Sequence, residues 1–427
     1  MKAIGIDIGT TGISGILLNA DNGSVIKSIS KNSNSFIKTQ NAWEKIQDVN
    51  KIITTAKEIL NELIEDGVKV IGVTGQMHGI VYFDENGIAL SPLYIWQDGR
   101  GDLEYKGTTY AKHLNSFTGY GCVTDFYNRE NGLVPKNSKG FCTIADYFVM
   151  NICGLNKPVI HTTNIQSFGC YDLENKKFNY DYSPNITDDF TICGYYKNIP
   201  VSVAIGDNQA SVLSCTKETD LLINVGTGSQ VSVISNSITF SESLETRPYF
   251  EGKYLTVGSA LCGGRAYSLV KDFIKDIISY KAEVSEEEVY KIMGEMLRKI
   301  DKPSVKADTR FAGTRYDSSI KGSFTNITTE NFKIEQFVYS VLFGMNEELF
   351  DMYVKMNSIK NSVVGSGNGI RKNAHLISII ENTYGTKLKI PKHVEEASFG
   401  SAIFGLIAIN KFSSVSKAQE IINYVNQ

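Results

Sequence analysis

At 427 residues the chain is too long for one typical hydrophobic core, so its length predicts two domains, residues 1–200 and 201–427. Hydrophobic residues make up 42% of the chain and charged residues 21%, as in ordinary globular proteins. The formal net charge of −3 argues against a nucleic-acid partner or an anionic membrane surface, because both attract strongly basic proteins.

The cysteines and the first residues of the chain indicate the cellular compartment. None of the seven cysteines has C-x-x-C spacing or lies near a histidine at zinc-ligand spacing. We therefore expect reduced thiols in a cytoplasmic protein. Asp7 interrupts the first apolar run, which is unlike a signal peptide, and no run approaches the 18 apolar residues of a membrane span.

Residues 3–19 predict a strand, a tight turn and a second strand. Residues 4–8 alternate apolar with small or polar side chains, and a second apolar run follows at 13–18. The turn between them, GTTG at 9–12, has glycines that permit positive φ and small hydroxyls that can reach a ligand. With Asp7 beside it, such a turn suits a phosphate and its magnesium ion. A purely structural hairpin is the alternative.

The first half continues with an α/β pattern. Residues 43–65 carry a one-sided apolar stripe that predicts a helix, and residues 68–74 predict a buried strand. This strand ends in GQMHG at 75–79, at the kind of strand end where α/β sheets bind ligands. After a predicted hairpin at 81–90, YIWQDGR at 94–100 combines an aromatic ring with Asp and Arg, as sugar sites do. A satisfied structural His78, and an Asp–Arg surface pair beside a core Trp, are the alternatives.

The stretch from 106 to 200 has no spacing that identifies chemistry. Residues 118–127 predict a polar and aromatic loop, residues 143–153 a short helix, and residues 167–180 a hairpin.

The second half begins with a predicted strand at 201–205, which runs into GDNQ at 206–209 and a short helix. Asp207 is therefore held at a strand end that a substrate can reach, or it is simply the N-cap of the helix. Residues 221–234 then repeat the opening pattern, since Ile-Asn-Val-Gly-Thr at 223–227 matches Ile-Asp-Ile-Gly-Thr at 6–10. This internal similarity predicts a duplicated fold with two phosphate-binding turns.

The remaining residues predict mostly helices, at 266–278, from a cap at Ser285, and at 334–356, 374–384, 395–411 and 416–425. Two glycine-rich turns precede helices, one at Gly263 and Gly264 and one in GSGNG at 365–369. Glycines here allow close approach of a base or phosphate, and a plain strand-to-helix turn is the alternative.

Taken together, these motifs resemble those of the FGGY family of carbohydrate kinases along nearly the whole chain. IDIGTTG (6–12) and NVGTGSQ (224–230) are similar to the two phosphate motifs, and GSGNG (365–369) to the adenosine motif. GQMHG (75–79) and WQDGR (96–100) look like the ketose site, and GDNQAS (206–211) like the catalytic-base motif. The resemblance implies an α/β fold of two actin/hexokinase-like (ribonuclease H-like) domains with a ligand cleft between them.

The resemblance also implies roles for individual residues. Asp207 is the expected catalytic base, and Asp7 the expected ligand of Mg²⁺. The residues expected to bind the sugar are Gln76, Met77, His78, Trp96, Asp98, Arg100 and Asn208. Those expected to bind ATP are Gly9, Thr10, Thr11, Gly226, Thr227, Gly228, Gly263, Gly264, Gly365, Gly367 and Asn368.

Two branches of the family compete for the substrate. GQMHG, W-x-D-G-R and GDN are similar to xylulose kinases, whereas residues 118–127, residues 206–215 and the compact length look more like sedoheptulokinases. We expect a ketose and ATP as partners, sedoheptulose as the favoured ketose, and a monomer or homodimer. A non-catalytic ATP-binding protein of the same fold is the alternative from another class, and Asp207 with the 75–100 motifs argues against it.

Overall fold

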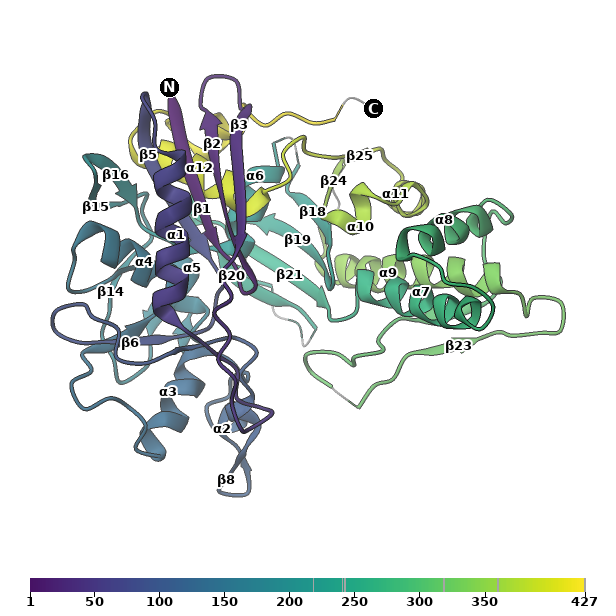
Figure 1. Cartoon of the computed structure of the whole chain (residues 1–427), viewed down its shortest axis with the longest axis horizontal. Coiled ribbons are helices and arrows are strands. Elements are labelled where there is room, and N and C mark those ends of the chain that lie inside the picture. The colour runs from purple at the N-terminus through teal and green to yellow at the C-terminus, as the bar shows by residue number, and fades with distance from the viewer. Residues whose placement is uncertain (218, 240, 242, 318, 359–360, 426–427) are drawn as a thin grey trace. The chain divides into compact units, whose positions relative to one another are not determined.

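The structure is a computed structural model that describes residues 1–217, 219–239, 241, 243–317, 319–358 and 361–425. The chain forms two compact units, whose elements are labelled in Figure 1. The first unit comprises Met1–Lys217, Arg247–Tyr254 and His393–Asn423, and the second comprises Glu218–Thr246, Leu255–Lys392 and Tyr424–Gln427. The division into domains at residue 200, and the ligand cleft expected between domains, stay predictions.

A mixed sheet forms the centre of the first unit. Its strands are β1 (Lys2–Ile8), β2 (Gly12–Asn19), β3 (Val25–Asn32), β5 (Val68–Gly75), β15 (Ile192–Tyr196), β16 (Ile199–Ser202) and β17 (Ile205–Gly206). The order is β15-β16-β5-β1-β2-β3, with β17 also paired to β5. β1 runs antiparallel to β2 and parallel to β5, so the carboxyl ends of β1, β5 and β17 lie at one edge of the sheet.

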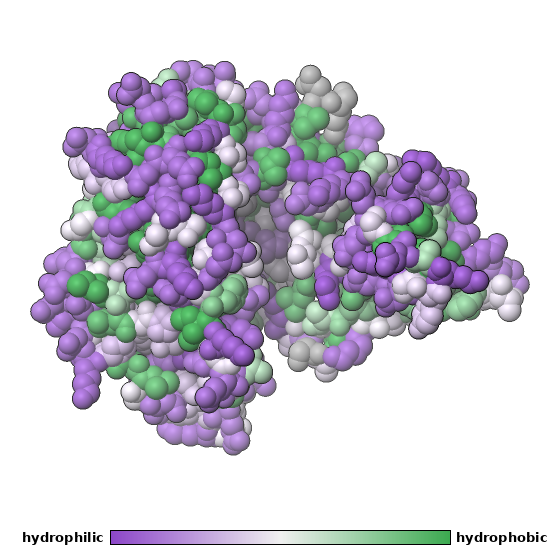
Figure 2. Space-filling model, in the orientation of Figure 1, coloured by the Kyte–Doolittle hydropathy of each residue, from purple (hydrophilic) through white to green (hydrophobic). Residues whose placement is uncertain are grey.

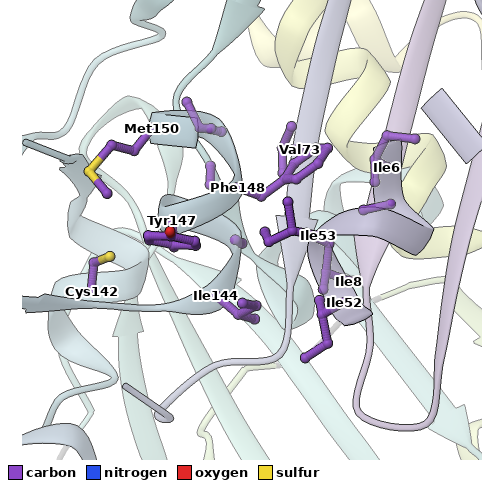
Figure 3. Packing of buried hydrophobic residues seen from close by; sticks show 14 of the residues in the cluster. Ile6, Ile8, Ile52, Ile53, Val73, Cys142, Ile144, Tyr147, Phe148 and Met150 are labelled. Carbon is purple, nitrogen blue, oxygen red and sulfur yellow. The ribbon is translucent and has the colours of Figure 1, made fainter. Parts of the chain in front are cut away.

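Helices α1 (Val49–Leu63) and α4 (Ile144–Cys153) contribute to the hydrophobic core on one face of this sheet. Ile6 and Ile8 of β1 and Val73 of β5 are buried in this core with apolar side chains of both helices, as Figure 3 shows. Gly15 of β2 faces α1 directly, because a Cβ there would lie 2.6 Å from Ile59 Cγ2. The alternation of apolar residues in β1 therefore matches the buried face that it predicts.

Helix α12 (Glu396–Ala408) packs against β1 and β5 through glycines, at backbone distance. A Cβ on Gly5 would lie 1.8 Å from the carbonyl oxygen of Ser398, and a Cβ on Gly72 would lie 1.8 Å from that of Ser401. Helix α6 (Asp207–Cys215) approaches α12 in the same way, because a Cβ on Gly400 would lie 1.8 Å from the carbonyl oxygen of Ala210. These contacts fix the start of α6 relative to the end of β1.

Shorter elements complete the first unit. The strands are β4 (Ile46–Gln47), β6 (Val81–Phe83), β7 (Leu93–Tyr94), β8 (Glu104–Tyr105), β9 (Thr108–Thr109), β10 (Gly140–Cys142), β11 (Val159–His161), β12 (Tyr171–Asp172), β13 (Lys177–Phe178) and β14 (Asn185–Thr187). The helices are α2 (Tyr110–His113), α3 (Gly121–Glu130), α5 (Thr162–Gln166) and α13 (Val415–Gln419), with 3-10 turns η1 (Gly99–Asp102) and η2 (Phe250–Gly252).

The second unit has a sheet of order β20-β21-β19-β18-β24-β25. Its strands are β18 (Leu221–Val225), β19 (Ser229–Ser235), β20 (Glu245–Pro248), β21 (Tyr254–Ala260), β24 (Val363–Ser366) and β25 (Leu388–Lys389), and a separate pair is β22 (Lys306–Asp308) with β23 (Ser323–Thr325). Its helices are α7 (Gly264–Ser279), α8 (Glu286–Leu297), α9 (Ile334–Lys355), α10 (Asn368–Arg371) and α11 (Ala374–Tyr384).

The predicted repeat of the opening hairpin is confirmed. β18 pairs antiparallel with β19 and parallel with β24, just as β1 pairs antiparallel with β2 and parallel with β5. The predicted helices at 266–278, 334–356 and 374–384 are present as α7, α9 and α11, and Ser285 caps α8 by accepting a hydrogen bond from the backbone N–H of Glu288.

The prediction of a loop at 118–127 is wrong, because helix α3 begins at Gly121. The sequence does not predict this helix because its buried face includes polar residues. Asp125 and Asn128 are residue types typical of exposed positions, yet both are buried. Asp125 accepts a hydrogen bond from Tyr82, and Asn128 accepts one from Arg100. A buried helix face made partly of hydrogen-bonded polar groups has no apolar stripe to reveal it.

Some predicted boundaries are also wrong. The helix expected from residue 43 begins only at Val49, since Asp48 caps it and β4 precedes it. β3 is an edge strand with mostly exposed side chains, and a strand of this kind needs no apolar pattern. The closing helix expected at 416–425 is the short α13.

The surface and the cysteines add two observations. Figure 2 shows hydrophilic side chains over most of the visible surface of each unit, with apolar side chains scattered among them. All seven cysteines are free thiols. Within the described ranges, no helix has both the length and the apolar character needed to cross a membrane.

We predict that Gly72→Ala lowers the free energy of unfolding by about 3 kcal/mol, because its Cβ would force the backbone of α12 away from β5. Urea denaturation followed by circular dichroism measures the change. Gly294→Ala is the matched control: a Cβ there meets nothing within 4 Å, so the better helix former is expected to add about 1 kcal/mol. Equal stability of Gly72→Ala and the unmodified chain would contradict the packing of α12.

Candidate active site

The turn after β1 is joined to the carboxyl end of β5 by a network of hydrogen bonds. Thr10 Oγ1 donates to Gln76 Oε1 at 3.3 Å, and Gln76 Nε2 donates to Gln47 Oε1 at 3.0 Å. Gln47 closes the loop by donating from Nε2 to the carbonyl oxygen of Thr10 at 2.6 Å. The indole nitrogen of the exposed Trp96 donates to Thr10 Oγ1 at 3.0 Å. The structure thus brings together the predicted phosphate turn and two predicted sugar-site residues.

His78 has an unusual backbone and an immobilised ring. Its φ is 72°, in the left-handed region that non-glycine residues rarely occupy. Its backbone N–H donates to Ser167 Oγ, its Nδ1 lies 2.9 Å from the carbonyl oxygen of Ser167, and its ring stacks on Tyr120 at 4.2 Å. Such backbone conformations gather at functional sites, where the surrounding contacts hold them in place.

Asp98 and Arg100 form a buried ion pair rather than a surface pair. Asp98 is fully buried and Arg100 is 1% exposed, with Arg100 Nε 2.6 Å from Asp98 Oδ1. The Asp98 carboxylate also accepts the backbone N–H groups of Lys45 and Arg100, and the Arg100 guanidinium lies over the rings of Tyr94 and Tyr127. In this arrangement Asp98 and Arg100 hold the 94–100 loop against the stretch around Lys45.

Two carboxylates lie close together at the carboxyl edge of the first sheet. Asp7 is near the end of β1, where its Oδ1 is buried and has no hydrogen-bond partner among the described residues. Burial, followed by the negative charges of Asp207 and Glu395, raises the pKa of Asp7 to about 8. This concentration of negative charge suits a cation. The described residues contain no group of three or more His, Cys, Asp or Glu side chains that could hold a metal by themselves.

Asp207 is the first residue of α6, and Gly206 takes the N-cap position, so the simple N-cap interpretation of Asp207 is wrong. Burial raises the pKa of Asp207 to about 6, while Arg247 and backbone N–H groups act in the opposite direction. The carboxylate is therefore ionised at pH 7 but retains an affinity for protons close to neutrality, which is the property that general-base catalysis requires. Asn208 follows it, half-buried in the same turn.

In the second unit, several predicted nucleotide residues meet around the turn after β18. The backbone N–H of Gly264 donates to the carbonyl oxygen of Gly226, and that of Arg265 donates to Thr227. A Cβ on Gly263 would lie 2.4 Å from the backbone of Gly228, and one on Gly367 would lie 2.5 Å from the carbonyl oxygen of Val225. The start of α7 and the turn before α10 therefore both pack at backbone distance on this turn.

Three predicted residues lie apart from these clusters or have other surroundings. Gly365 is a buried strand residue paired with Ile223, and its missing side chain leaves room for Leu388. Gly9 permits the tight turn itself, since a Cβ would lie 2.9 Å from the carbonyl oxygen of Gly12. Thr11 is exposed at the tip of the same turn.

Sequence reasoning missed Gln47 and Arg247. Gln47 is a fully buried polar residue in a stretch expected to be helical, and no motif marks it. Arg247 is 2% exposed and follows a stretch with no recognisable pattern, about 170 residues after the motif that it contacts. An isolated arginine within a short polar run gives no sign that the fold will bury it.

Comparison with known proteins identifies relatives of the whole chain. Residues 2–187 match the FGGY family of carbohydrate kinases, N-terminal domain. A sedoheptulokinase from Mus musculus is 27% identical, covering 94% of this chain and 96% of its own, and a xylulose kinase from Staphylococcus epidermidis is 24% identical, covering 99% and 91%. The crystal structure of a ligand-bound xylulose kinase from Lactobacillus acidophilus superposes with a TM-score of 0.83 at 17% identity, covering 100% of this chain and 93% of that one.

The fold is α/β, of the actin/hexokinase-like type. The chain is a carbohydrate kinase, that is, a phosphotransferase with an alcohol group as acceptor. Residues 2–187 match the FGGY family, as the motifs predict, and the relatives that align over the whole chain are named sugar kinases.

We predict that Asp98→Asn lowers the free energy of unfolding by about 3–5 kcal/mol, because the buried Arg100 guanidinium loses its charged partner. Asp181→Asn is the control: Asp181 is 96% exposed and pairs with Arg129 on the surface, so about 0–1 kcal/mol is expected. Chemical denaturation measures both. Unchanged stability of Asp98→Asn would contradict the role of the buried ion pair in holding the 94–100 loop.

Proposed function

We propose that this sugar kinase transfers the γ-phosphate of ATP to the terminal hydroxyl of a ketose, sedoheptulose, to give sedoheptulose 7-phosphate. The observation that carries the proposal is the pair of electrostatically coupled carboxylates, Asp7 and Asp207, at the same sheet edge as the motif at 75–79. The mouse relative named sedoheptulokinase, which aligns over 94% of the chain, supports the choice of sugar.

Asp207 is the proposed general base. Phosphoryl transfer depends mainly on positioning and charge neutralisation, so the protein's proton chemistry is limited to the attacking hydroxyl. Asp207 accepts the proton of the terminal hydroxyl as that oxygen attacks the γ-phosphorus and ADP leaves. Its position at the first turn of α6, which α12 fixes through Gly400, keeps the carboxylate in place for this step.

Asp7 is the proposed holder of Mg²⁺, and its buried, unpartnered Oδ1 fits that role. Mg²⁺ is usually held by one or two carboxylates together with waters and substrate phosphates, so a single carboxylate suffices here. The bound ion would neutralise charge on the phosphates of ATP.

The other predicted site residues are proposed to bind the sugar, the phosphates or the nucleotide. In the first unit, Gln76, Met77, His78, Trp96, Asp98 and Asn208 form the sugar site, with Arg100 orienting Asp98. Backbone and hydroxyl donors hold the phosphates at Gly9, Thr10, Thr11, Gly226, Thr227 and Gly228. The residues proposed to line the nucleotide are Gly263, Gly264, Gly365, Gly367 and Asn368.

A panel of acceptors tests the substrate. With ATP and Mg²⁺, we expect the kcat/KM for sedoheptulose to exceed that for xylulose, ribulose, fructose and glycerol by about tenfold or more, measured by coupled ADP release. Xylulose is the second candidate, because the motifs at 75–79 and 96–100 are similar to those of xylulose kinases. A preference for xylulose would overturn the choice of sugar but keep the kinase reaction.

Removal of the base tests the mechanism. Asp207→Asn is expected to lower kcat about 10²–10⁴-fold while the Kd for ATP, measured by calorimetry, stays unchanged. Because the pKa of Asp207 is raised to about 6, kcat of the unmodified enzyme should fall about tenfold per pH unit below pH 6, as the base becomes protonated.

The exposed Asp189 provides the matched control, since Asp189→Asn makes the same change away from the site. Equal turnover by Asp207→Asn and Asp189→Asn would contradict the assignment of the base.

A further inference from the structure

Arg247 is a buried arginine beside the proposed sugar site. It lies at the end of β20, in the segment Arg247–Tyr254 that belongs to the first unit, and only 2% of it is exposed. Its Nη1 atom lies 4.0 Å from the sulfur of Met77, in the GQMHG motif. The guanidinium is thus placed against one of the residues predicted to contact the sugar.

The same sulfur connects Arg247 to the start of α6. A Cβ on Gly206 would lie 2.8 Å from Met77 Sδ, so the sulfur packs on the residue immediately before Asp207. The backbone beside Arg247 is also held there, because Gln209 Nε2 donates to the carbonyl oxygen of Pro248 at 3.2 Å. Both the side chain and the backbone at this point of β20 are therefore fixed against the first turn of α6.

The charge of Arg247 acts on the proposed base. It lowers the pKa of Asp207 and so opposes the effect of burial, which favours the protonated acid. A fixed positive charge is thus close enough to the carboxylate to affect its protonation.

The chemistry of these groups suits a polyol. A guanidinium carries several N–H donors in a rigid planar fork, so it can bind a sugar hydroxyl in addition to its partners in the protein. A sugar whose terminal hydroxyl reaches Asp207 brings its neighbouring hydroxyl within about 3 Å of the reacting one. A donor next to Asp207 can therefore bind the neighbouring hydroxyl while Asp207 takes the proton from the reacting one.

We propose that Arg247 is a substrate-binding residue that donates a hydrogen bond to the sugar hydroxyl adjacent to the one being phosphorylated, and so selects acceptors that carry this hydroxyl. This inference rests on the proposed kinase reaction at Asp207. It adds a specificity determinant from β20 to the residues at 75–100, which the motifs alone single out.

The test compares two variants and two acceptors. Arg247→Met removes the donors and the charge at similar length, and Arg247→Lys keeps a charged donor. The acceptors are the ketose that the enzyme prefers and its analogue lacking the hydroxyl next to the terminal carbon. Arg298→Met, at an exposed arginine that follows α8, is the matched control.

With the full ketose, Arg247→Met should lose about 10- to 100-fold in kcat/KM, the usual cost of a hydrogen bond to a charged group, while the KM for ATP stays unchanged. With the deoxy analogue, Arg247→Met should lose less than about twofold relative to the unmodified enzyme when both are assayed at about pH 9, because the hydrogen bond is already absent and Asp207 is ionised in both proteins at this pH. Arg247→Lys should show the same dependence on the hydroxyl with a smaller loss, and Arg298→Met should match the unmodified enzyme.

An equal loss with both acceptors would overturn the proposal and make Arg247 a structural residue. If Arg247→Met does not fold, as judged by its thermal transition, the same two acceptors are compared with Arg247→Lys. An equal loss with both acceptors would then overturn the proposal. Failure of this inference is distinct from failure of the proposed function: in the first case the unmodified enzyme phosphorylates the ketose, and in the second it phosphorylates no sugar at all.

Discussion

The close packing of α12 on the first sheet is the constraint on which the candidate site depends. Glycines at positions 5 and 72 bring the sheet to backbone distance of α12, and Gly400 brings α12 to the same distance from α6. Backbone contacts of this kind leave little freedom, because protein interiors are packed as densely as organic crystals. The position of Asp207 relative to Asp7 therefore follows from glycines and not from any contact between the two acids.

This packing has an electrostatic consequence. It places Asp7 near Asp207 and near Glu395, which precedes α12, and burial raises the pKa of both Asp7 and Asp207. Buried carboxylates are costly unless a positive group or hydrogen bonds compensate them. Arg247 provides the positive charge and the backbone at the start of α6 provides the hydrogen bonds that compensate Asp207, whose pKa is therefore raised only to about 6. For Asp7, burial and the negative charges of Asp207 and Glu395 all raise the pKa, which is about 8. A cation is therefore the natural counterpart of the Asp7 carboxylate.

Much of the fold could be predicted from the sequence, and particular residues show why the rest could not. The strands of both hairpins and helix α11 follow from apolar periodicity, because each buries one face on a core. Helix α3 was missed because Asp125 and Asn128 are buried through hydrogen bonds, which periodicity does not reveal. The motif residues of the site lie at short spacings in the sequence. Gln47 and Arg247 reach it from distant segments, so only the tertiary contacts identify them.

The two hairpins show how one backbone arrangement can be adapted to different charges. At equivalent positions β1 has Asp7, paired in register with Thr74, and β18 has Asn224, paired with Ser366. Asn224 donates from Nδ2 to Ser366 Oγ at 2.7 Å, so this neutral side chain is satisfied within its own sheet. Asp7 Oδ1 has no corresponding partner among the described residues. The two hairpins therefore share one backbone arrangement, but only the first adds a carboxylate that has an oxygen without a hydrogen-bond partner among the described residues.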